Sequence, residues 1–128
     1  RRVAGALKAL GVHPGDRVAL LAPNGDIFID FLFGTLWAGA VLNPVNTRWS
    51  AAEIAYSLVD SDTHVLLIHP QFLPQLAAIR EAASCLRHVI VLGDPAEGGG
   101  ELGQPRVQVS DDLVPRQIAG RPDRAVLR

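Results

Sequence analysis

The chain has 128 residues, of which 48% are hydrophobic and 20% are charged, and its formal net charge is −1 at pH 7. This length suits one domain with a substantial core, and the composition excludes an intrinsically disordered chain. The near-neutral charge excludes the basic footprint of a nucleic-acid-binding protein, and the single cysteine, Cys85, excludes a disulfide framework and a thiolate zinc site.

The first segment predicts a helix, a turn and a buried strand. Apolar residues at helical spacing indicate an amphipathic helix over residues 1–10, and Gly11 supplies the residue that ends it. Pro14-Gly15 suits the central pair of a type II turn, because Pro fixes φ and Gly accepts a positive φ. The nearly continuous apolar run of residues 17–22 is typical of a strand buried on both faces.

The next segment predicts an apolar helix followed by a second strand. Pro23 ends the first strand, and Asn24 is expected to cap a helix that is apolar over a wide arc and ends near Gly39. A short strand then begins at Val41-Leu42 and is limited by Pro44, which cannot donate to a sheet.

A third helix begins with a strong local signal. Ser50 and Glu53 form the pattern of a capping box, and Trp49 is placed to pack against Ile54 as a hydrophobic staple. This helix is expected to end around Asp60-Ser61, where two turn-forming residues follow one another.

The remaining residues continue the alternation and then change character. Residues 64–68 and 88–92 are expected to form strands, with a crossover helix over about 72–83 between them. Residues 106–109 alternate between polar and apolar side chains, which is typical of an edge strand. Residues 94–105 are rich in Gly and Pro and are expected to form a loop.

Strands that alternate with helices of roughly ten or more residues predict an α/β fold with a parallel sheet, helices on both faces and right-handed crossovers. We expect the first strand to lie beside the second and the third, as in a flavodoxin-like order. Residues 1–93 are assigned to this α/β core, and residues 94–128 to a loop-rich segment.

Two patterns resemble functional motifs and are interpreted otherwise. Residues 98–103 match G-x-G-x-x-G, but five residues separate them from the preceding strand and no helix follows, so a dinucleotide site is not indicated. His64 and His69 lie five residues apart on an extended segment, so their side chains point to opposite faces. We expect neither a metal site nor a catalytic residue in this chain.

Arg48 is the one candidate ligand-binding residue. It follows the second strand, at the edge of the sheet where open α/β folds place their ligand sites. It also stands just before a helix, where its guanidinium can offer two parallel donors to a phosphate. The alternative interpretation is that Arg48 caps a surface turn or pairs with a nearby acid.

Three segments, taken together, resemble the amino-terminal region of the adenylate-forming acyl-CoA synthetases, also called AMP-dependent synthetases and ligases. They are residues 11–18, residues 37–48, and the helix of residues 50–59 with its exit. The resemblance covers residues 1–92 and continues more weakly to residue 127.

The resemblance implies a function for the longer enzyme. Full-length members use ATP and Mg2+ to convert a small carboxylic acid to an acyl-adenylate, and then transfer the acyl group to coenzyme A. Residues 122–127 look like the approach to the family's phosphate loop, which is absent here, as are its later catalytic segments. We therefore expect the chain to be inactive alone and to bind none of these cofactors firmly. In some relatives the arginine that matches Arg48 reaches a phosphate of coenzyme A.

A different class of function stays open, namely a non-catalytic α/β module that binds or regulates a partner. The chain starts at Arg1 and contains no Met, so we expect a piece of a longer, cytoplasmic protein. No apolar run reaches the roughly 18 residues of a membrane span. The sequence names neither the acyl substrate nor the oligomeric state.

Overall fold

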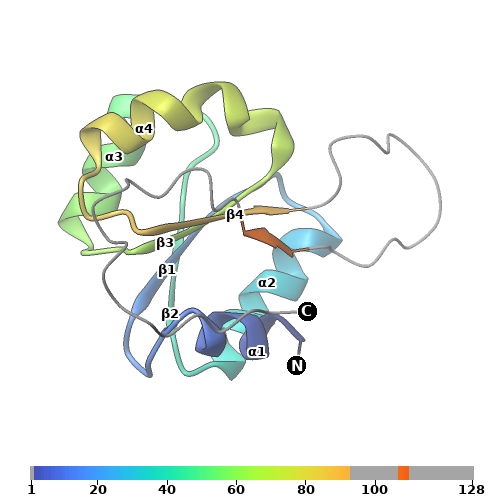
Figure 1. The fold of residues 1–128 in the computed structure, drawn as a ribbon. Helices are drawn as coiled ribbons and strands as arrows, with labels where there is room; N and C mark the ends of the chain where they lie inside the picture. Colours follow the sequence, from blue (N-terminus) through green and yellow to red (C-terminus); the bar gives the residue numbers. More distant parts are fainter. Residues whose placement is uncertain (1, 93–106, 110–128) are drawn as a thin grey trace.

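A computed structural model describes residues 2–92 and 107–109, and Figure 1 shows helices on both sides of one sheet. The strands and helices alternate along the chain, as the sequence predicts. The elements are α1 (Arg2–Ala9), β1 (Arg17–Leu21), α2 (Asp26–Trp37), β2 (Val41–Pro44), α3 (Ala51–Asp60), β3 (Val65–Ile68), the 3-10 helix η1 (Pro70–Gln75), α4 (Leu76–Ala82), β4 (His88–Leu92) and β5 (Val107–Val109).

The sheet has the order β2-β1-β3-β4-β5. Strands β1 to β4 are parallel, and β1 pairs with both β2 and β3, which confirms the expected position of the first strand. Strand β5 runs antiparallel beside β4 and forms one edge of the sheet, as the alternation of residues 106–109 indicates. The opposite edge is β2, which has β1 as its one neighbour among the strands of the described residues.

Two hydrophobic clusters lie on opposite faces of the sheet. One joins α3 and α4 to the sheet through the buried side chains of Ile54, Leu58 and Ile79. The other joins α1 and α2 to the other face through Leu7 and Phe31. Figure 1 shows the same two layers, with α3 and α4 above the strands and α1 and α2 below them. The predicted class, a parallel sheet covered on both faces, is confirmed.

Glycines set the two tight reversals between α1 and β2. Gly15 has φ +89°, and the amide of Asp16 donates to the carbonyl of His13 at 3.0 Å, which confirms the predicted turn. Gly39 has φ +79° and follows the C-cap residue of α2, Ala38, which confirms the predicted end of that helix. The carbonyl of Gly39 accepts from the amide of Gly15 at 2.9 Å, so the two reversals are tied together.

Two local predictions are wrong. Asn24 does not cap α2: the capping position falls to Gly25, and no side chain accepts from the first turn. The helix expected over residues 72–83 is divided into η1 and α4, because Pro74 has no amide hydrogen to donate in an α-helix.

The segment at 98–103 lies outside the described residues, as does most of residues 94–128.

Among the helices of the described residues, none has both the length and the apolar character needed to cross a membrane.

Candidate functional site

A hollow of about 360 Å³ opens at the carboxyl ends of β1 and β2. The chain leaves β1 for α2 on one face of the sheet, and it leaves β2 for α3 on the other face. Because the two loops diverge, the space between them stays open, as at other strand ends where the connections separate. The lining residues are Ala22, Asn24, Phe28, Pro44, Val45, Asn46, Thr47 and Trp49.

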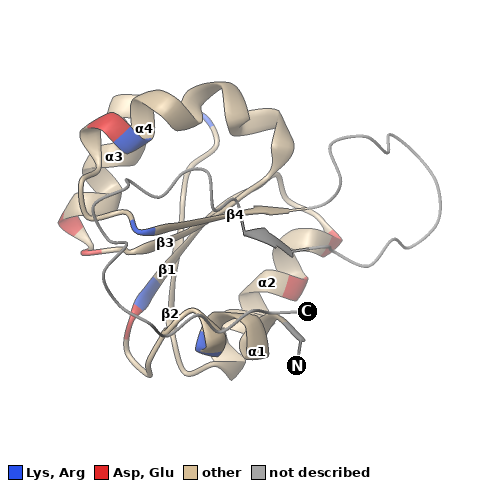
Figure 2. Cartoon of the chain, in the orientation of Figure 1, with Lys and Arg blue, Asp and Glu red and all other residues tan. Residues whose placement is uncertain are grey.

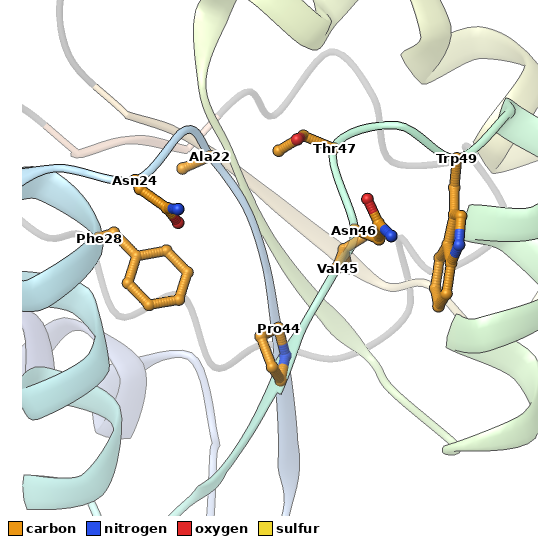
Figure 3. A pocket seen from close by; sticks show the side chains of 8 residues that line it. All are labelled: Ala22, Asn24, Phe28, Pro44, Val45, Asn46, Thr47 and Trp49. Atoms are coloured by element: carbon orange, nitrogen blue, oxygen red, sulfur yellow. The ribbon is translucent and has the colours of Figure 1, made fainter.

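The lining combines two aromatic rings with neutral polar groups. Figure 3 shows Asn24 and Phe28 on one side of the hollow and Asn46 and Trp49 on the other, with Pro44 between them. Among the described residues, no charged side chain lines the hollow. The surface therefore suits an uncharged group with hydrogen-bonding atoms, and any charge on a ligand has to be met at its rim.

The loop after β2 is held by its own hydrogen bonds. The amide of Val45 donates to the carbonyl of Leu20 at 3.0 Å, which fixes the start of the loop to β1. Asn46 Oδ1 accepts from the amide of Arg48 at 2.9 Å, and the carbonyl of Asn46 accepts from the amide of Trp49 at 3.1 Å. Such an Asx turn fixes the backbone without any contact from a ligand.

The capping box predicted at the start of α3 is confirmed. The amide of Ser50 donates to Glu53 Oε2 at 2.7 Å, and the amide of Glu53 donates to Ser50 Oγ at 3.3 Å. Glu53 Oε2 also accepts from the hydroxyl of Ser50 at 2.9 Å. The hydrogen bonds that this carboxyl accepts from the backbone amide and the hydroxyl of Ser50 lower its pKa, because they stabilise its charged form. Trp49 is 36% exposed and Ile54 is buried, and the predicted staple between them stays a prediction.

A polar network that the sequence did not reveal fixes the other end of α3. Asn43 Nδ2, from β2, donates to Ser61 Oγ at 3.0 Å and lies 3.4 Å from Ser57 Oγ. Ser61 Oγ lies 2.7 Å from Thr63 Oγ1, which belongs to a fully buried residue. Because α3 is tied to β2 here and capped at Ser50, the loop between them is held at both ends.

Arg48 lies in this loop with an exposed side chain, between the lining residues Thr47 and Trp49. Within the described residues, neither of the two ion pairs includes its guanidinium. Figure 2 shows basic and acidic residues dispersed over the elements, without a basic cluster. The alternative in which Arg48 pairs with an acid is therefore not seen in the described part of the chain, and its charge faces solvent at the rim.

None of the four histidines lines the hollow, although the amide of His88 donates to the carbonyl of His64 at 3.0 Å. His64 Nδ1 lies 2.9 Å from the carbonyl of Cys85, and its Nε2 lies 3.5 Å from a carboxylate oxygen of Asp62. His69 Nδ1 accepts from a backbone amide at the start of η1. Burial lowers the pKa of His88, and the neighbouring Arg87 lowers it further. Over residues 2–92 and 107–109, no three His, Cys, Asp or Glu side chains gather where they could hold a metal ion.

Sequence reasoning missed Asn24 and Phe28 as lining residues. Asn24 was interpreted as a helix cap, and Phe28 as one of many apolar residues of α2. Both residues follow the carboxyl end of β1. Because the sequence predicts that the second strand lies beside β1, this position was the available signal for residues that line a site between the two strand ends.

Comparison with known proteins gives one consistent result. A family model described as AMP-binding enzyme matches residues 1–126. A long-chain-fatty-acid–CoA ligase of Thermus thermophilus is 41% identical over 99 residues, which are 77% of this chain and 18% of that protein. The chain thus spans less than a fifth of that relative's length.

Two solved structures share the fold. The anthranilate CoA ligase AuaEII, in complex with anthranoyl-AMP, matches with a TM-score of 0.68 and 35% identity, over 71% of this chain and 18% of that one. The amino-terminal domain of FACL13 from Mycobacterium tuberculosis matches with a TM-score of 0.67 and 30% identity, over 84% of this chain and 34% of that domain.

Proposed function

The chain belongs to the AMP-binding enzyme family, and from that membership we propose that it serves as the amino-terminal part of an ATP-dependent carboxylate–CoA ligase. The observation that carries this proposal is the family match over residues 1–126. The α/β fold agrees with it, because the solved anthranilate CoA ligase AuaEII shares this fold over 71% of the chain at 35% identity. We further propose a cytoplasmic location, in line with the single free thiol of Cys85.

The described residues provide only some of the groups that the chemistry of such an enzyme requires. Adenylation needs cationic groups and Mg2+ to neutralise the charge that develops on the phosphates of ATP. The described residues gather no carboxylate cluster for Mg2+, and the hollow is lined by neutral groups alone. We assign no step of adenylation to these residues and propose that the remaining parts of a longer ligase supply them.

We predict that the purified 128-residue chain releases no pyrophosphate from ATP. The assay would supply ATP, Mg2+ and a series of carboxylic acids, and would compare the release of pyrophosphate with that of a protein-free blank. A rate above the blank that scales with the concentration of the chain would contradict the proposal that its adenylation groups lie elsewhere.

The exposure and position of Arg48 support a role for this residue in binding coenzyme A. Its guanidinium is exposed and has no ion pair among the described residues, and its backbone is fixed by the turn at Asn46. A cationic side chain on a fixed backbone at the rim of a neutral hollow can bind a phosphate while an uncharged part of the same ligand enters the hollow. Coenzyme A combines phosphates with a neutral amide chain, and we propose that Arg48 binds one of those phosphates.

The variant Arg48→Ala tests this role in an active chimera, in which these residues replace the matching segment of the Thermus thermophilus ligase. One charge-assisted hydrogen-bond contact contributes about 1.5–3 kcal/mol, so the KM for coenzyme A should rise about tenfold or more. The KM values for ATP and the fatty acid should stay unchanged. The matched control is Arg17→Ala, an exposed arginine at the amino end of β1. An unchanged KM for coenzyme A would remove Arg48 from the site.

A further inference from the structure

The three asparagines of the chain differ in how readily their side chains can lose ammonia. In this reaction the backbone nitrogen of the next residue attacks the side-chain carbonyl carbon, and water later opens the ring that forms. A side chain on the next residue hinders the attack, and a following proline has no N–H group to supply the attacking nitrogen. The residue that follows each asparagine therefore decides how fast it reacts.

Asn24 is the asparagine whose neighbour favours this reaction. It is followed by Gly25, which carries no side chain beside its backbone nitrogen. Asn43 precedes a proline, so this ring closure is closed to it, and Asn46 precedes a threonine, which is branched at Cβ. The sequence thus places the most reactive amide at Asn24.

The folded chain leaves the reacting groups of Asn24 and Gly25 unengaged. Asn24 is exposed and does not cap α2. Within the described part of the chain, its side chain forms no hydrogen bond and the amide of Gly25 donates to no acceptor. A Cβ atom built at Gly25 would meet no atom within 4 Å, so the space around the attacking nitrogen is open.

The other two asparagines are held by hydrogen bonds. Asn43 Nδ2 donates to Ser61 Oγ at 3.0 Å, and Asn46 Oδ1 accepts from the amide of Arg48 at 2.9 Å. Ring closure at Asn46 would have to break the bond that fixes its side chain, whereas ring closure at Asn24 breaks none. The structure therefore adds to the difference that the following residues already create.

Asn24 also lines the hollow at the ends of β1 and β2. Figure 3 shows its amide on the wall of the hollow, near Phe28. Loss of the amide nitrogen replaces this neutral group with a carboxylate, which is ionised at neutral pH. The reaction would therefore place a negative charge on a lining that is otherwise neutral.

We propose that Asn24 is a site of deamidation, and that the reaction changes the hollow from neutral to anionic. The nitrogen of Gly25 forms a bond to Asn24 Cγ, the bond from Cγ to Nδ2 breaks, and Nδ2 leaves as ammonia with the proton that Gly25 gives up. Water then opens the ring. Attack at Cγ gives aspartate, and attack at the backbone carbonyl gives isoaspartate, which adds one methylene group to the main chain just before α2.

The new charge acts on ligands of the same hollow. This consequence rests on the proposed contact between Arg48 and a phosphate of coenzyme A, whereas the deamidation itself does not. A carboxylate at position 24 repels a phosphate held at the rim by Coulomb interaction. Deamidation of Asn24 should therefore weaken the binding of coenzyme A.

The first test follows the purified 128-residue chain during incubation at mildly alkaline pH, which favours loss of the proton from the attacking amide. Trypsin cleaves after Arg17 and Arg48, so one peptide contains all three asparagines, and tandem mass spectrometry locates the acid form. We expect conversion at Asn24 to be about tenfold or more faster than at Asn46, because Gly leaves the nitrogen open and Thr covers it. An isoaspartate methyltransferase should label the incubated chain.

The matched control is Gly25→Ala, which adds a methyl group where there is space and leaves the lining of the hollow unchanged. This variant should remain largely unconverted under the same conditions. Equal rates at Asn24 and Asn46 would overturn the proposal. It would also be overturned if Asn24 stayed an amide in the folded chain while a synthetic peptide of residues 20–30 converted, since the fold would then protect it.

The second test measures the consequence in the active chimera. Asn24→Asp reproduces the aspartate product and should raise the KM for coenzyme A about threefold or more by charge repulsion, while Gly25→Ala should leave it unchanged. An unchanged KM in Asn24→Asp, beside a raised KM in Arg48→Ala, would overturn the effect of the charge but not the role of Arg48. Unchanged KM values in both variants would overturn the proposed coenzyme A site as well, and the mass spectra would still decide whether Asn24 reacts.

Discussion

Replacement of Phe31 by Ala is expected to lower the free energy of unfolding by about 3–5 kcal/mol, the usual cost of removing a fully buried aromatic side chain. Phe31 is 1% exposed and fills the space between α2 and the sheet, in a cluster with Leu7 and Leu20. Truncation removes this apolar contact and leaves a cavity that the neighbouring strand and helix fill only in part. Urea unfolding of the purified chain, followed by circular dichroism, measures the difference.

The matched control is Phe33→Ala, which makes the same chemical change on the same helix. Phe33 is 63% exposed and belongs to neither cluster, so its truncation should change the stability of the 128-residue chain by no more than about 0.5 kcal/mol. Equal costs for the two variants would mean that α2 is rotated about its axis relative to the structure described above. The same pair also separates the side of α2 that packs in the core from the side that is exposed.

The second large effect is expected at the contact between α1 and α2. A Cβ atom at Gly34 would lie 2.5 Å from both Cβ and Cγ1 of Val3, which is closer than atoms can approach without displacement. Gly34→Ala should therefore destabilise the chain by about 1–3 kcal/mol, as overpacking of a core does. This is expected even though Ala favours a helix by about 1 kcal/mol over Gly, because Val3 Cβ is attached directly to the backbone and cannot rotate away.

A double-mutant cycle identifies the cause of this loss. Val3→Ala removes the two atoms beyond Cβ and should recover part of the stability that Gly34→Ala loses, so that the two changes are not additive. The control is Gly5→Ala in α1, where a new Cβ meets nothing within 4 Å. That variant should gain up to about 1 kcal/mol from helix propensity alone. Additive losses at Val3 and Gly34 would rule out a direct contact between the two positions.

Much of the candidate site was predictable from local sequence. The capping box at Ser50 and Glu53 is a short-range pattern, and it fixes where α3 begins and hence where Arg48 lies. The wrong assignment concerned Asn24, because the residue type favours a cap while the chain path after β1 gives that position to Gly25. A residue that can cap a helix can equally line a ligand site, and its local sequence does not distinguish the two.

The sequence by itself determined the order of strands and helices, the parallel sheet and the position of Arg48, because glycines, prolines and capping residues act over a few neighbours. It could not determine which side of α2 faces the core. The apolar residues of that helix cover a wide arc, so its periodicity is weak, and the packing of Val3 and the sheet against one side leaves Phe33 outside. The hollow beside Arg48 likewise depends on tertiary structure, since it exists only where two loops leave adjacent strands toward opposite faces.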